Sequence, residues 1–78
     1  MNKENLFKII SEALDVDSVD EDSSMGNLDE WDSLGHLSVL SAIDRELDGK
    51  ASKLTAFASA SSVNAIIKIL EENNLIQE

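Results

Sequence analysis

The segment WDSLGHLSVLSAIDREL, residues 31–47, limits what this chain can fold into more than any other feature of the sequence. It contains no proline, and its one glycine, Gly35, lies close to its beginning, so no residue interrupts a long helix. Asp32 is of the type that accepts hydrogen bonds from the free N–H groups at a helix start, which predicts a helix beginning at Ser33. Gly49 follows the segment and can adopt the left-handed conformation that closes helices, so we expect the helix to end there.

One side of this helix is predicted to be buried, because apolar residues recur at the helical spacing of about 100° per residue. The predicted buried stripe consists of His36, Val39, Leu40, Ile43 and Leu47, with Leu37 at its edge. The opposite side carries Leu34, Ser38, Ser41 and Arg45. Leu34 therefore places a large apolar side chain in solvent, directly after Ser33. An exposed leucine beside an exposed serine is typical of a contact surface.

Two further stretches have the apolar periodicity of helices. Residues 3–14 are predicted to form a first helix, with a buried side that consists of Leu6, Ile9, Ile10, Ala13 and Leu14. A last helix is predicted to be capped by Ser61 or Ser62 and to end near Asn73 and Asn74. Its apolar stripe consists of Val63, Ile66, Ile67 and Leu70.

The stretch before this last helix is less regular. Residues 50–60 hold only two large apolar side chains, Leu54 and Phe57, at the i, i+3 spacing of one short helical turn. No stretch of the chain reads as a strand. The sequence therefore predicts one all-α domain over residues 1–78, a small antiparallel bundle of three main helices plus one short helix.

A long acidic loop is predicted before the main helix. Residues 15–32 lack periodicity and are rich in Asp, Ser and Gly. The apolar residues that can attach this loop to the core are Val16, Val19, Met25, Leu28 and Trp31. No basic residue occurs between Lys8 and Arg45, and the acidic run leads directly to Ser33. It is either a solubilising surface or part of a functional surface around the serine.

Composition excludes several classes of function. The formal net charge of −10 disfavours nucleic acid and anionic membranes and favours basic partners. No apolar run approaches the roughly 20 residues that span a bilayer, so we expect no membrane insertion. The N-terminus MNKENLFKII lacks the order of a signal peptide, and the chain has no cysteine. We expect a monomeric cytoplasmic protein.

The spacing of residues does not fit a calcium-binding loop or a serine-hydrolase motif. A twelve-residue calcium loop beginning at Asp15 would place Asp20 where glycine is required and Gly26 where the bidentate glutamate belongs. A G-x-S-x-G hydrolase motif would need glycine in place of Trp31. His36 is interpreted as a packed, hydrogen-bonded residue rather than a catalytic base. We therefore predict no metal site and no catalytic residue.

The residues Asp32-Ser33-Leu34, with Trp31 before them and a long amphipathic helix after them, resemble the attachment motif of acyl carrier proteins. The resemblance extends over nearly the whole chain in length, acidity and helix spacing. It implies an acyl-carrier-like bundle in which Ser33 carries 4′-phosphopantetheine through a phosphodiester. The chain would be a non-enzymatic substrate of a phosphopantetheinyl transferase of the holo-carrier synthase type that uses coenzyme A.

Once attached, the arm would hold an acyl or aminoacyl thioester. It would present this cargo to loading ligases, acyltransferases or synthases of fatty-acid, polyketide or other specialised biosynthesis. Trp31 and the Gly-His-Leu after the motif look similar to discrete bacterial carriers of specialised pathways. Three positions differ from fatty-acid carriers, which tend to have acidic or apolar contact residues where this chain has Gly35, Ser38 and Ser41. Arg45 also inverts the charge expected at its position.

The resemblance also implies two surfaces. The partner interface is expected at Asp32, Leu34, Ser38, Ser41, Asp44 and Arg45. An acyl-chain cavity is expected between walls formed by Leu37, Leu40, Ile43, Leu54, Phe57, Val63 and Ile66. A second interpretation, from another class, is an acidic helical adaptor that binds a basic partner through Leu34 while Ser33 stays unmodified.

Overall fold

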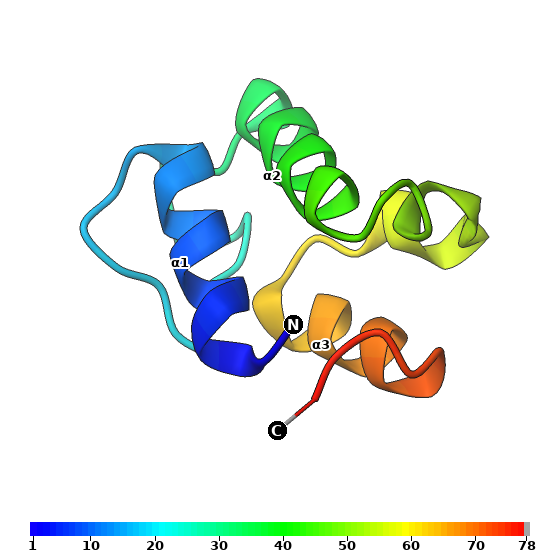
Figure 1. Ribbon diagram of the computed structural model, residues 1–78. Coiled ribbons are helices and arrows are strands. Elements are labelled where there is room, and N and C mark those ends of the chain that lie inside the picture. Colours follow the sequence, from blue (N-terminus) through cyan, green and yellow to red (C-terminus); the bar gives the residue numbers. More distant parts are fainter. Residues whose placement is uncertain (78) are drawn as a thin grey trace.

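The computed structural model describes residues 1–77, and these residues form three α-helices and two short 3-10 helices (Figure 1). In chain order the elements are α1 (Lys3–Leu14), α2 (Ser33–Glu46), η1 (Ala51–Lys53), η2 (Thr55–Ser59) and α3 (Val63–Glu72). Two isolated backbone bridges occur, but residues 1–77 contain no strand. The predicted all-α class is confirmed, as are the predicted bounds of α1.

Side-chain caps explain where the three α-helices begin. The side chain of Asn2 accepts from the backbone N–H of Asn5, and the side chain of Asn5 accepts in return from the N–H of Asn2. Asp32 caps α2, as expected. Of the two serines considered for α3, Ser62 is the cap, and its hydroxyl accepts from the N–H of Ala65.

The end of α2 lies close to the predicted glycine. The helix ends at Glu46, and the next residues turn away with positive φ angles of 55° at Asp48 and 82° at Gly49. The N–H of Gly49 then donates to the carbonyl of Asp44, which satisfies one of the last free acceptors of the helix.

The long loop of residues 15–32 is attached to the fold at several points. Its backbone meets the entry to α3, where Met25 N–H donates to Ser61 and Val63 N–H donates to Ser23. Its apolar side chains pack against the core, as predicted, and these are Val16, Val19, Met25, Leu28 and Trp31. The loop is therefore an ordered part of the domain.

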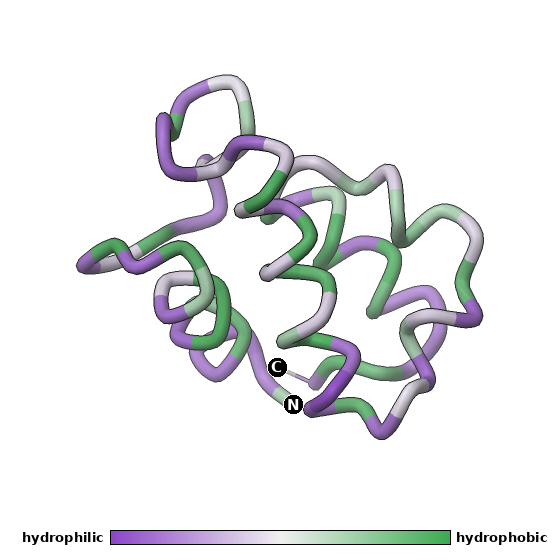
Figure 2. Tube along the Cα trace, turned by 90° about the horizontal axis from the view of Figure 1, so that it is seen from above, coloured by the Kyte–Doolittle hydropathy of each residue, from purple (hydrophilic) through white to green (hydrophobic). Residues whose placement is uncertain are grey.

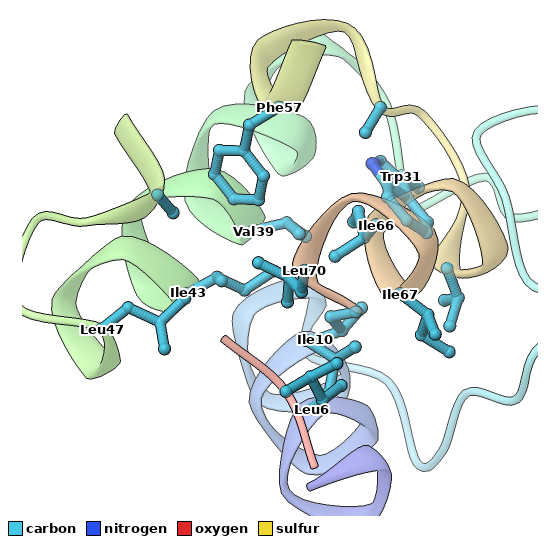
Figure 3. Packing of buried hydrophobic residues seen from close by; sticks show 14 of the residues in the cluster. Leu6, Ile10, Trp31, Val39, Ile43, Leu47, Phe57, Ile66, Ile67 and Leu70 are labelled. Atoms are coloured by element: carbon cyan, nitrogen blue, oxygen red, sulfur yellow. The ribbon is translucent and has the colours of Figure 1, made fainter. Parts of the chain in front are cut away.

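One hydrophobic core lies where the helices meet (Figure 3). Its fully buried large side chains come from α1, α2, α3 and the loop, and they are Leu6, Ile10, Trp31, Val39, Ile43, Val63, Ile66 and Leu70. Phe57 of η2 points into the same core. Figure 2 shows how hydrophobic and hydrophilic residues alternate along the helices that enclose it. The two ends of the described chain meet, since Gln77 N–H donates to the Met1 carbonyl.

The predicted short helix after α2 is replaced by η1 and η2. A 3-10 helix has three residues per turn, so side chains at i and i+3 point the same way. Leu54 and Phe57 have this spacing, and both pack on the core. The apolar pattern predicted the turn correctly, but two apolar residues cannot hold an α-helix of normal length.

Gly35 is required where α1, the loop and α2 come together. A Cβ atom at this position would overlap the carbonyl oxygen of Glu30 and lie 2.9 Å from Cδ2 of Leu14. A backbone carbonyl cannot move aside as easily as the end of a flexible side chain. The gain in helix propensity from alanine is therefore smaller than the cost of this overlap.

We expect Gly35→Ala to lower the free energy of unfolding by about 1–3 kcal/mol, because it overpacks the junction. Gly26→Ala is the matched control, since its Cβ would meet only Ser24 Oγ at an ordinary 3.6 Å. Urea unfolding followed by circular dichroism measures both variants. Equal stability of the two variants would contradict the close approach described here.

Candidate functional site

Ser33 is the first residue of α2, and its side chain is exposed. The Asp32 carboxylate accepts from Gly35 N–H at 2.8 Å, and the Asp32 carbonyl accepts from His36 N–H at 2.8 Å. The N–H groups of Ser33 and Leu34 have no acceptor within the helix, as is general for a first turn. Ser33 therefore offers a hydroxyl at the positive end of the α2 dipole.

A buried tryptophan fixes this end of the helix. Trp31 is 1% exposed, and its indole N–H donates to Nδ1 of His36 at 3.0 Å. The two rings stack at an interplanar angle of 28°. Because Asp32 has extended backbone, the chain turns from the core at Trp31 to the surface at Ser33 within two residues. The burial of Trp31 therefore sets the position of Ser33.

His36 is half-buried and hydrogen-bonded through both ring nitrogens. Its Nδ1 accepts from Trp31, so its Nε2 carries the proton in the neutral ring and donates to the carbonyl of Ala58 at 2.9 Å. This agrees with the interpretation of His36 as a packed residue. Sequence reasoning missed Trp31 as its partner, because an i, i+5 spacing does not place two side chains on one helix face.

Two large apolar side chains are exposed next to Ser33. Leu34 is 77% exposed, as predicted, and Leu37 is 61% exposed. The expected burial of Leu37 at the edge of the core stripe is wrong. At about 100° per residue, Leu37 lies roughly 100° around α2 from the middle of that stripe, on the side it shares with Leu34. The pair forms an apolar patch beside the serine.

The other predicted interface residues are mostly exposed. The exposed ones lie on α2 or directly before it, and they are Asp32, Ser38, Ser41 and Arg45. Asp44 differs, because it is half-buried and its Oδ1 accepts from the backbone N–H of Ser52 at 2.8 Å. Part of this carboxylate therefore holds η1 rather than facing solvent freely.

The structure brings together only part of the predicted cavity wall. Leu40, Leu54 and Phe57 line a surface pocket of about 220 Å³ between α2 and the η1–η2 region. The rest of its lining is Ser41, Asp44, Ser52 and Ala58. Ile43, Val63 and Ile66 are buried in the core, and Leu37 is exposed outside it. Helical phase identified Leu40, but the folding of residues 51–60 over α2 decides which side chains meet.

The acidic side chains of residues 15–32 are exposed, and Glu21 forms an ion pair with Lys3 of α1 at 3.6 Å. Over residues 1–77, no group of three or more His, Cys, Asp or Glu side chains is placed to hold a metal ion. None of the described helices has the length and apolar character to cross a bilayer.

Comparison with known proteins gives no assignment: no family model, no curated protein and no solved structure matches this chain significantly.

We expect Leu34→Ala to change the free energy of unfolding by less than about 0.5 kcal/mol, because the side chain lies in solvent. Leu6→Ala, at a fully buried position, should lower it by about 2–5 kcal/mol. Thermal or urea unfolding of the two variants measures both effects. A Leu34→Ala variant as unstable as Leu6→Ala would show that the phase assigned to α2 is wrong.

Proposed function

We propose that this protein is a non-catalytic acyl carrier in which Ser33 is esterified with 4′-phosphopantetheine. The observation that supports it most is the exposed hydroxyl of Ser33 at the start of α2, within Asp32-Ser33-Leu34. The small all-α fold, with an acidic loop before this helix, is compatible with an acyl-carrier-like bundle. The protein would act in the cytoplasm, where coenzyme A and the partner enzymes are found.

The residues around Ser33 suit a phosphodiester. The free N–H groups of a helix start favour a phosphate group, and exposure leaves the hydroxyl accessible to an enzyme. The described residues place no base in hydrogen-bond contact with this hydroxyl, and His36 is engaged by Trp31 and Ala58. A separate transferase must therefore supply the base.

The proposed reaction is a group transfer. Ser33 Oγ attacks the phosphorus of coenzyme A that bears the pantetheine arm, and a new P–O bond forms. The pyrophosphate bond breaks, adenosine 3′,5′-bisphosphate leaves, and the serine proton passes to the base of the transferase. The transferase would also hold a Mg²⁺ ion, which would supply positive charge for the leaving group. The bound arm then supplies a thiol that forms thioesters with acyl or aminoacyl cargo.

The exposed side of α2 would receive the partner enzymes. Leu34 and Leu37 offer an apolar patch, and Ser38, Ser41 and Arg45 make the adjoining strip neutral to weakly basic. Complementary charge acts mainly on encounter rate and on exclusion of wrong partners. We therefore expect each partner enzyme to dock through an apolar pocket that receives Leu34 and Leu37, without a strongly basic surface around this pocket. These partners are the transferase and the loading ligases, acyltransferases or synthases.

The pocket beside α2 would shelter the first part of the cargo. Leu40 lies seven residues beyond Ser33, which is about 10 Å along the helix axis. The pocket volume of about 220 Å³ is below the roughly 300–1,000 Å³ of most small-molecule sites. In this form of the protein, the pocket suits a short acyl chain better than a long one.

The same exposed leucines also support the second function, an acidic helical adaptor. Leu34 and Leu37 would then be the apolar contact for a basic partner protein, and Ser33 would remain unmodified. Covalent modification separates the two functions.

We expect incubation with coenzyme A, Mg²⁺ and a broad-specificity phosphopantetheinyl transferase to add one phosphopantetheine per chain, measured by intact-protein mass spectrometry. Ser33→Ala should abolish the addition. Ser61→Ala, at an exposed serine outside the proposed partner surface, is the matched control and should be modified like the unaltered protein. An unchanged mass, or an addition that persists in Ser33→Ala, would reject the carrier and favour the adaptor.

A further inference from the structure

Residues 51–60, which we call the η strap, follow α2 in the chain and lie beside it (Figure 1). Two side chains of α2 hydrogen-bond to the strap. At one end, Asp44 Oδ1 accepts from the N–H of Ser52 at 2.8 Å. At the other end, Nε2 of His36 donates to the carbonyl of Ala58 at 2.9 Å. We propose that the η strap is a movable cover over the pocket beside α2, and that His36 is the latch that holds its Ala58 end closed.

The strap has few internal supports of its own. Neither η1 nor η2 has a side-chain cap, and η1 spans only three residues. Its buried anchors are Ala51, Phe57 and Ala60, whereas Ser52, Lys53, Thr55, Ala56, Ala58 and Ser59 are exposed. Short 3-10 turns have poor hydrogen-bond geometry, and segments with few buried contacts open at low free-energy cost. The two side-chain contacts are therefore the polar part of its attachment to α2, beside the burial of Ala51, Phe57 and Ala60.

The pocket lies between the two contacts. Asp44, Ser52 and Ala58, which form the polar attachments, also belong to its lining. Leu40 of α2 and Phe57 of the strap form apolar walls. Release of Ala58 from His36 would let the strap turn about its Asp44 end and widen the pocket on the side nearer Ser33.

The latch is oriented in advance by the core. Trp31 is 1% exposed and donates to Nδ1, which fixes both the ring plane and the tautomer of His36. The Nε2–H therefore points to the carbonyl of Ala58. Forming this hydrogen bond costs His36 little further side-chain conformational entropy. His36 joins the loop, α2 and η2 in one chain of hydrogen bonds. This inference does not depend on modification of Ser33.

Two substitutions separate the halves of this arrangement. In His36→Gln, the amide nitrogen reaches the place of Nε2 and can still donate to Ala58. In His36→Asn, the amide oxygen takes the place of Nδ1 and can accept from Trp31, but the shorter side chain cannot reach Ala58. Both variants remove the imidazole, so a difference between them reports the latch.

The test is amide hydrogen exchange by nuclear magnetic resonance. The Phe57 and Ala60 amides donate within the strap to Leu54 and Phe57, so their exchange reports how often these turns open locally once the Ala58 end is released. Relative to amides of α1, we expect His36→Asn to speed their exchange about threefold to tenfold, the range that one net hydrogen bond supplies. His36→Gln should keep their exchange within about twofold of the unaltered protein. Equal acceleration in both variants, or no acceleration in either, would overturn the latch.

The unaltered protein gives an independent test, which also holds if a variant fails to fold. The ¹⁵N shifts of the His36 ring in its neutral form should show a protonated Nε2 and an unprotonated Nδ1. A ring protonated at Nδ1 alone could not accept from Trp31 while donating to Ala58, and this result would overturn the arrangement.

Discussion

The hydrogen bond between the buried indole of Trp31 and the imidazole of His36 is the interaction on which the site depends. It fixes Trp31, near the end of the loop, against the first full turn of α2, and the extended Asp32 between them caps the helix. Ser33 then lies at the surface as the first residue of the helix. Gly35 allows the same turn to lie against the loop and α1 without a side chain between them. A change in any of these contacts would move the serine.

Local rules in the sequence predicted much of this arrangement. The bounds of α1, the cap at Asp32 and the exposure of Leu34 follow from periodicity and capping, which depend on residues within one or two turns. The rest depends on segments that are distant in the chain. Leu37 remained exposed because no element covers that side of α2, and the bond from Asp44 to Ser52 requires the η strap to fold back. Likewise, three of the seven expected wall residues, Ile43, Val63 and Ile66, are buried in the core. A domain this small needs its few strongly apolar positions for the core itself.

The parts of the site divide the proposed work between this chain and its partners. The chain offers a hydroxyl without a base, an apolar patch of Leu34 and Leu37, and a small pocket that begins about two turns beyond the serine. Reactivity would come from the enzymes that dock on it. A carrier of this kind needs a rigid attachment point and an adaptable cargo site. One ring nitrogen of His36 bonds to the buried Trp31 at the attachment point, and the other bonds to the η strap beside the pocket.

The central claim is that the position of Ser33, rather than serine content or acidity, makes this protein a carrier. The most direct measurement is tandem mass spectrometry of peptides from the protein after treatment with coenzyme A and the transferase. The account predicts that phosphopantetheine is found on Ser33 alone, although Ser18, Ser38, Ser41, Ser52, Ser59 and Ser61 are also exposed. Phosphopantetheine on another of these serines, or spread over several of them, would contradict it.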